Sequence, residues 1–173
     1  PGAMGDPVAD RYAPPGATHW MGTDLLGRDV FSRVLHGARV SLGIAAASVL
    51  VSVGLGVAVG AAAAWHGRWV DATLMRFTDL VLAFPRLFLV LLLVALVEPG
   101  PQRIVVALGA TGWMGVARVV RGQVLQQREV EYVLAARALG VADRSLLWRH
   151  VLPATAAPVL ALSTLRIGNA ILA

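Results

Sequence analysis

Four apolar stretches separated by polar segments dominate this sequence. The longest runs from Val40 to Ala64 and contains no charged residue. At ~1.5 Å per residue, a helix over this range is longer than the ~30 Å hydrocarbon core of a bilayer. The pattern therefore predicts a membrane-spanning helix at about 40–64. Gly56 and Gly60 form a small-xxx-small pair within it, which lets two helices pack closely in lipid.

The other apolar stretches predict three further spans, at about 72–97, 104–120 and 154–173. Pro85 interrupts the first of these, and proline removes a helix hydrogen bond and clashes with the preceding turn. We therefore expect that span to be kinked near Phe84. Together the four spans predict an all-α fold, a polytopic transmembrane helical bundle over residues 40–173.

The polar segments predict how the chain is oriented in the membrane. If the spans alternate in direction, the loop at 121–153 shares its side with the hinge at 65–71, and the N-terminal segment 1–39 lies opposite. The arginines on the loop side are Arg68, Arg76, Arg118, Arg121, Arg128, Arg137, Arg144 and Arg149. Those on the other side are Arg11, Arg28, Arg33, Arg39 and Arg103. By the positive-inside rule, we expect 121–153 to be cytoplasmic and 1–39 to be extracytoplasmic.

The composition supports a membrane protein. Hydrophobic residues make up 57% of the chain and charged residues only 14%, whereas soluble domains carry about 25% charge. The net charge of +5 would also suit a nucleic-acid-binding protein. However, the arginines flank the apolar spans and form no stripe on a soluble face, so we predict contact with lipid and none with nucleic acid.

The sequence offers no enzyme chemistry. Every basic residue is arginine, so the phosphate-binding lysine of a P-loop is missing and the chain cannot hydrolyse ATP by that route. There is no cysteine, and the four histidines have no partner at the spacing of a zinc pair. We therefore predict no catalytic residue, no metal site and no cofactor.

Three segments carry a more specific signal. They are GTDLLGRDVFSRVLHGARVSL at 22–42, MRFTDLVLAFP at 75–85 and EYVLAARALGVADRSLLWRHVLP at 131–153. In this order they resemble the C-type permease subunit of the dipeptide/oligopeptide/nickel group of binding-protein-dependent ABC transporters. The resemblance implies the MetI-like permease fold and covers almost the whole chain from Gly22. Because that family has a further spanning helix before the first segment and more sequence after residue 173, we expect a fragment truncated at both ends.

The segment at 131–153 resembles the family's cytoplasmic coupling loop, which contacts the ATPase. The resemblance assigns this role to Glu131, Ala135, Ala136, Arg137, Gly140, Arg149 and Pro153. Leu134 stands where the family pattern has glutamate, and His150 stands where it has isoleucine.

The residues of this segment also suit docking by themselves. Small alanines let a helix lie in a groove, Gly140 permits a turn by a positive φ or a close approach, and Asp143 or Ser145 suits a helix cap. The alternative is a loop of ordinary turn and cap residues that touches nothing.

Charged residues outside the loop give further hypotheses. Asp24, Arg28, Asp29 and Arg33 alternate in sign at helical separations, which predicts a network at the outer mouth, or simple capping by Thr23 or Asp24. Arg76 and Asp79 are expected to pair at i and i+3.

Arg166 would lie near the middle of the last span, so it is expected to face either the translocation path or a buried partner. On the path it would receive the terminal carboxylate of a peptide.

The resemblance implies a permease that forms the path for ATP-driven import of peptides, or of nickel, across a bacterial or archaeal cytoplasmic membrane. Its implied partners are a paralogous permease subunit, ABC ATPase subunits and an extracytoplasmic solute-binding protein. The alternative is an ATP-independent secondary transporter or channel subunit. That alternative needs intramembrane acids or a filter loop, and Asp79 at the edge of a span is the sole candidate in the sequence. A membrane scaffold that transports nothing is a third alternative.

Overall fold

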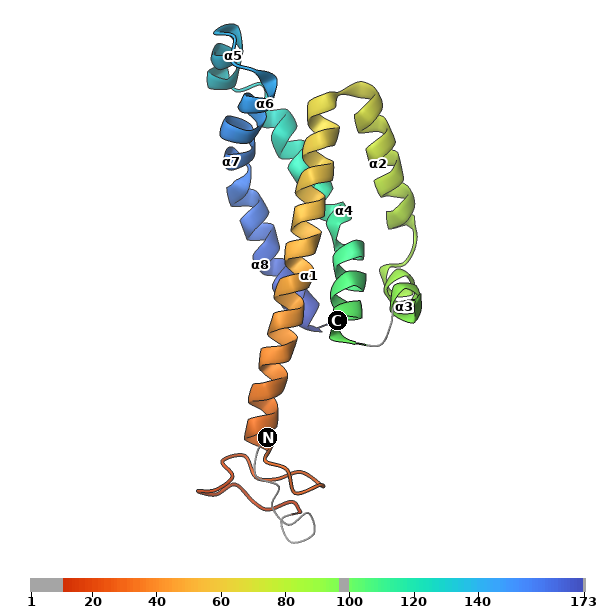
Figure 1. Ribbon diagram of the computed structural model, residues 1–173, viewed down its shortest axis with the longest axis vertical. Coiled ribbons are helices and arrows are strands. Elements are labelled where there is room, and N and C mark those ends of the chain that lie inside the picture. The colour runs from red at the N-terminus through yellow and green to blue at the C-terminus, as the bar shows by residue number, and fades with distance from the viewer. Residues whose placement is uncertain (1–10, 97–99, 173) are drawn as a thin grey trace. The chain divides into compact units, whose positions relative to one another are not determined.

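The computed structural model describes residues 11–96 and 100–172, without the side chains at 166, 167 and 169–172. Its helices are α1 (Val30–His66), α2 (Arg68–Ala83), α3 (Arg86–Leu96), α4 (Pro101–Gln127), α5 (Glu131–Ala138), α6 (Asp143–Leu146), the π-helical turn η1 (Leu147–Val151), α7 (Leu152–Ala154) and α8 (Ala156–Leu172) (Figure 1). Apart from an isolated bridge between Thr23 and Asp29, the regular structure in the described part is helical. The all-α prediction is therefore confirmed. The chain divides into unit 1, Pro1–Gly43, and unit 2, Ile44–Ala173.

The lengths and compositions of the helices are those of a membrane protein. Helices α1 and α4 are each long and apolar enough to cross a bilayer, and α2 with α3 pass the same test together. The apolar part of α8 that is described, Ala156–Leu165, is shorter. Helix α1 begins before the span expected at 40, and α4 ends at Gln127, so residues 121–127 are helical and belong to α4.

A sharp break separates α2 from α3. The two helices meet at an angle of 90°, so the bend is larger than a simple kink. Phe84 is extended, with φ −81° and ψ 138°, because the ring of Pro85 disfavours a helical residue before it. No residue of α3 is buried. The position of the break was predicted by the sequence, while its size was not.

Helices α1 and α4 pack with their backbones in close contact. A Cβ atom built on Gly56 would lie 2.5 Å from Cβ of Val116, and one built on Gly60 would overlap the carbonyl oxygen of Ala117. A Cβ atom on Gly109 of α4 would lie 2.7 Å from a side-chain carbon of Val51. The small residues on both helices therefore allow the approach, as the small-xxx-small pair predicts.

The core of unit 2 continues from this contact toward α5 and η1. Its buried members are Ala61, Ala64, Val116, Val120, Val124, Val133, Leu147, Val151 and Val159. Since Val133 belongs to α5 and Leu147 and Val151 belong to η1, the short helices of the 121–153 segment are anchored in the same core as the long ones.

The close approach predicts that Gly60 does not tolerate a larger side chain. Gly60→Leu should force α1 and α4 apart and lower the stability of the complete protein by about 1–3 kcal/mol, the usual cost of overpacking. The measurement is the temperature at which half of the detergent-solubilised protein aggregates. Gly54→Leu is the matched control, since nothing lies within 4 Å of a Cβ built there. Equal effects of the two substitutions would contradict the packing.

Candidate functional site

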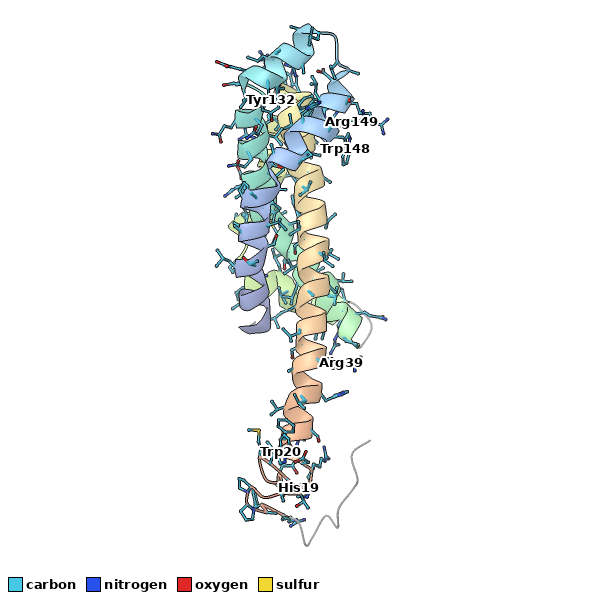
Figure 2. All side chains as sticks on the ribbon, turned by 90° about the vertical axis from the view of Figure 1, so that its left-hand side faces the viewer. His19, Trp20, Arg39, Tyr132, Trp148 and Arg149 are labelled. Carbon is cyan, nitrogen blue, oxygen red and sulfur yellow. The ribbon has the colours of Figure 1, made fainter. Side chains whose placement is uncertain are left out.

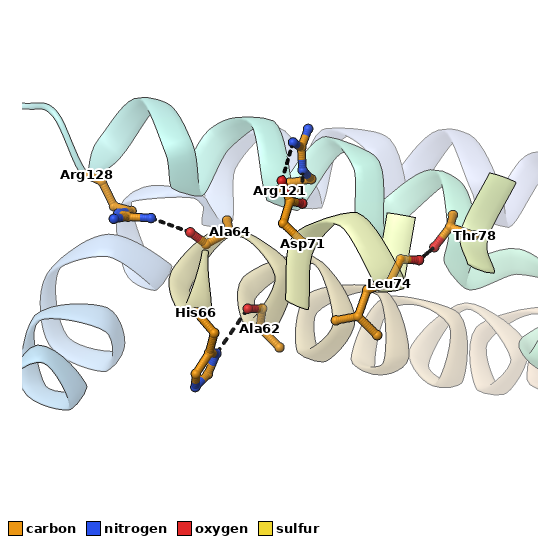
Figure 3. A network of polar contacts seen from close by, with 8 residues as sticks. All are labelled: Ala62, Ala64, His66, Asp71, Leu74, Thr78, Arg121 and Arg128. Carbon is orange, nitrogen blue, oxygen red and sulfur yellow. Dashed lines mark hydrogen bonds and ion pairs between the residues drawn. The ribbon is translucent and has the colours of Figure 1, made fainter. Parts of the chain in front are cut away.

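The candidate site is the group of short helices that follows α4. In Figure 1, α5 and α6 lie at the same end of unit 2 as the connection between α1 and α2. Arg128, the residue that ends α4, donates a hydrogen bond from its guanidinium to the carbonyl oxygen of Ala64 near the end of α1 (Figure 3). Carbonyl groups in the last turn of a helix lack partners within the helix, so this contact satisfies one of them.

Helix α5 buries little of its surface in this chain. Val133 is its only buried residue, and Ala136 is half-buried while Ala135 is exposed. Glu131 lies in the first turn, where its charge is favourable next to the positive end of the helix dipole. Most of α5 is therefore accessible to a partner, including Ala135 of the two alanines predicted to dock.

The backbone at Gly140 reverses the chain after α5. Its φ is +82°, the N–H of Gly140 donates to the carbonyl of Arg137 at 3.0 Å, and the N–H of Val141 donates to that of Ala136 at 3.2 Å. This pair of bonds is a Schellman motif, which favours glycine at the left-handed position. Nothing lies within 4 Å of a Cβ built on Gly140, so the conformation, and not a close approach within this chain, requires the glycine.

The expected caps of the following helix are absent. Ala142 precedes α6 and makes no side-chain cap, so the prediction that Asp143 or Ser145 caps this helix is wrong. Asp143 lies inside the first turn and its carboxylate is 3.4 Å from the guanidinium nitrogen of Arg137. The helix begins one residue earlier than the sequence suggests, which moves the carboxylate from a capping role to an ion pair with α5.

Pro153 lies in α7, directly after the π-helical turn η1 that contains Arg149. Proline cannot donate a backbone hydrogen bond, and in η1 the N–H of Leu152 donates to Leu147, five residues back. Pi-helical turns are rare and occur often at functional sites. The π-helical turn therefore changes the direction in which the following side chains point, just before the last span.

Large apolar side chains are exposed on these short helices. Leu139 is 86% exposed and Trp148 is 62% exposed, and Figure 2 shows Trp148 and Arg149 projecting outward from η1. A shallow open groove beside them is lined by Ala142, Arg144, Ser145, Trp148 and Arg149. We call the exposed residues Leu134, Ala135, Leu139, Trp148 and Arg149 the α5–η1 surface.

Sequence reasoning missed the part of Leu139 in this surface. The available signal was a large apolar residue next to a turn glycine in an otherwise polar segment.

The outer-mouth residues lie in unit 1, where Asp24, Arg28 and Asp29 precede α1 and Arg33 lies in its first turns. Asp24 accepts the backbone N–H groups of Leu26 at 2.8 Å and Arg28 at 3.0 Å, and it pairs with Arg33. The backbone N–H of Arg28 is the main cause that lowers the pKa of the Asp24 carboxyl. The structure thus brings Asp24 and Arg33 together as expected, but through a turn in which Gly27 has φ +69°.

The cap of α1 is Asp29, and the prediction that Thr23 or Asp24 fills this role is wrong. Asp29 accepts the N–H of Ser32 at 3.0 Å, three residues into the helix. The hydroxyl of Ser32 is the first cause that lowers the pKa of the Asp29 carboxyl, and the ring of His19 lies 3.4 Å from it. Thr23 instead accepts the N–H of Ala13 through its hydroxyl, which holds the turn together.

Ion pairs join α2 to α4. Arg121 binds both carboxylate oxygens of Asp71, at 2.5 and 2.6 Å (Figure 3). Asp79 pairs with Arg118, so the predicted Arg76–Asp79 pair is wrong. The partner of Asp79 is thus an arginine of the neighbouring helix α4, in place of the arginine three residues before it.

Two further predictions concern Arg166 and metal binding. The side chain of Arg166 lies outside the described residues. Among the side chains that are described, no group of three or more His, Asp or Glu residues could hold a metal ion.

Comparison with known proteins gives the family. Residues 36–173 match the family described as "Binding-protein-dependent transport system inner membrane component". The chain is 41% identical over 166 residues to the dipeptide transport system permease protein DppC of Bacillus subtilis. It is 40% identical over 158 residues to the oligopeptide transport system permease protein OppC of the same organism. It is 37% identical over 158 residues to the glutathione transport system permease protein GsiD of Pectobacterium atrosepticum.

These alignments cover 96%, 91% and 91% of this chain but 52% of each relative. The chain therefore spans about half the length of the curated relatives that it matches. The match over residues 36–173 includes all the predicted spans and the segment that resembles a coupling loop. The chain belongs to the family of binding-protein-dependent transport system inner membrane components, which confirms both the resemblance and the inner-membrane location predicted from the sequence.

Proposed function

We propose that this protein is the permease subunit that forms the translocation path for ATP-driven import of peptides across the cytoplasmic membrane. The observation that carries the proposal is the α5–η1 surface, a set of exposed residues on and beside helices anchored in the core, of which all but Arg149 are apolar or small. Large apolar side chains exposed beside a groove suit a protein interface, since exposed apolar patches often mark one. The names of three similar permeases refer to dipeptide, oligopeptide and glutathione transport, which favours peptides over nickel as the substrate.

The proposed partners follow from the surfaces of the chain. ABC ATPase subunits would bind the α5–η1 surface, because a chain without lysine has no P-loop and needs ATP to be hydrolysed elsewhere. Helix α3 exposes large apolar residues, among them Leu87 and Phe88, which suit either lipid or a paralogous permease subunit. An extracytoplasmic solute-binding protein would deliver the peptide, since the family is one of binding-protein-dependent systems.

The charges of α2 favour this proposal over an ATP-independent transporter. Ion-coupled transport needs an acidic side chain that can bind and release a proton or cation. Both acidic residues of α2, Asp71 and Asp79, already pair with arginines of α4. These carboxylates therefore serve the packing of the two helices, and the energy for transport is left to the ATPase.

Docking of the ATPase on α5 predicts a large effect of charge at Ala135. This side chain is exposed in the chain, so Ala135→Asp should leave folding and membrane insertion unchanged. In an interface, the same change would bury an unpaired charge. We expect the amount of co-purified ATPase to fall roughly tenfold or more, since each ~1.4 kcal/mol is a factor of ten in affinity.

The matched control for this experiment is Ala17→Asp, the same substitution at an exposed residue of the N-terminal segment. It should leave the yield of ATPase unchanged. Normal co-purification with Ala135→Asp would show that α5 is a passive connector and would remove the main support for the proposal.

The proposed orientation predicts which single cysteines are accessible from outside. Residues 1–173 contain no cysteine, so a reporter placed among them is the single thiol of this sequence. Ala142→Cys, in the exposed groove, should react with a membrane-impermeant thiol reagent only after the membrane is opened. Ala17→Cys should react in intact spheroplasts. The reverse labelling pattern would invert the orientation and place the α5–η1 surface away from any cytoplasmic ATPase.

A further inference from the structure

The ring of Trp65 lies where three helices meet. Trp65 is in the last turn of α1, is half-buried and packs against the core of unit 2. The guanidinium carbon of Arg128, at the end of α4, is 5.5 Å from the centre of the ring. That of Arg137, in the last turn of α5, is 5.7 Å from it. One aromatic side chain at the end of α1 thus contacts the ends of α4 and α5.

Both arginines are also held from a second side. Arg128 donates a hydrogen bond to the carbonyl oxygen of Ala64, one residue before Trp65 (Figure 3). Arg137 lies 3.4 Å from the carboxylate of Asp143 at the start of α6. Tryptophan gives the strongest cation–π attraction among the aromatic residues, and this attraction acts over the face of the ring. The contacts therefore form a continuous chain from α6 through α5 to the end of α1.

We propose that Trp65 is a positioning residue that couples movement of α5 to α1 during transport. The inference rests on the proposed function, in which an ATPase moves α5. Helix α5 buries only Val133 in the core, and its Tyr132 contacts Gln127 of α4 and the ring of His150 in η1. The contact of Arg137 with Trp65 joins the last turn of α5 directly to the last turn of α1. Any displacement of α5 is then passed to α1.

A purely structural role for Trp65 is the alternative. Tryptophan is frequent at the membrane interface, and Trp69 of α2, which is 80% exposed, suits that role. An interfacial anchor would affect how much complex assembles. A positioning residue would instead affect how much peptide is moved for each ATP hydrolysed, in a complex that assembles normally.

The experiment uses the complete transporter in proteoliposomes, with the binding protein and a peptide substrate. Three quantities are measured: the co-purified ATPase, the rate of ATP hydrolysis and the number of peptides imported per ATP hydrolysed. For Trp65→Leu we expect unchanged co-purification and a fall in peptides per ATP of roughly threefold to tenfold, the range of effects along coupling contacts. Trp65→Phe keeps an aromatic face and should restore most of the ratio, while the control Trp69→Leu should leave it unchanged.

Arg137→Gln gives an independent test if Trp65→Leu fails to assemble. It removes the guanidinium that joins α5 to the ring of Trp65 and leaves the aromatic ring in place, so it should lower the same ratio. Where both variants assemble, the double variant should be no worse than the more severe single one, since the two side chains act through one contact.

Several outcomes would overturn the inference. A normal ratio in Trp65→Leu, or in Arg137→Gln where Trp65→Leu does not assemble, would show that the contact does not transmit movement. Equal losses in Trp65→Leu and Trp69→Leu would indicate an interfacial anchor. Absence of the ATPase from the unaltered complex is a different result, since it would contradict the proposed function itself and with it the role of Trp65.

Discussion

The close approach of α1 and α4 is the contact on which the rest of unit 2 depends. Lipid removes the hydrophobic driving force between helices, so association relies on van der Waals packing and interhelical hydrogen bonds. Gly56 and Gly60 supply the packing, and the hydroxyl of Ser52 donates to the carbonyl of Gly109 at 3.1 Å. Because backbone meets backbone, neither helix can slide along the other without a clash. This fixed register brings the end of α4 to the end of α1, where Arg128 reaches Ala64.

Helix α4 holds a second helix by charge. Arg118 and Arg121 pair with acidic residues of α2, and the rings of Phe77 and Trp113 stack with centroids 6.4 Å apart. An unpaired charge inside a membrane costs about 2.5–3.5 kcal/mol on insertion scales, so pairing removes a penalty that either helix would otherwise carry. Helix α4 thus packs against α1 through small residues and against α2 through ion pairs of its arginines. Its C-terminal end leads into α5.

The sequence predicted the features that follow from local pattern. A charge-free apolar run predicted a helix at the position of α1, and an apolar run with a single arginine predicted one at the position of α4. The glycine spacing predicted a close contact, and Pro85 predicted the break. Two reasons for the glycine at 140 were possible from the sequence, a positive φ or a close approach, and the structure has the positive φ. These properties depend on residues that are neighbours in the chain, so periodicity and local sterics suffice to identify them.

Contacts between distant residues could not be read from the sequence in the same way. Asp79 has an arginine three residues before it, but its partner is Arg118, 39 residues away on another helix. The part of Trp65 was missed for the same reason, since its arginines belong to α4 and α5. The exposure of Leu139 depends on how α5 lies on the core, which no local pattern reports. Ion pairs and ring contacts between helices depend on how the helices pack, which only the three-dimensional structure shows.

The measurement that tests the account most directly is cross-linking from the α5–η1 surface. A photoreactive benzoylphenylalanine replaces Leu139, the most exposed apolar residue of that surface, in cells that make the complete transporter. A second probe at Leu160, an exposed residue of α8, is the control. The account predicts a covalent product between the permease and an ATPase subunit from position 139 and none from position 160. Efficient cross-linking from 139 to lipid or to other proteins, with no ATPase product, would contradict the claim that this surface receives the ATPase.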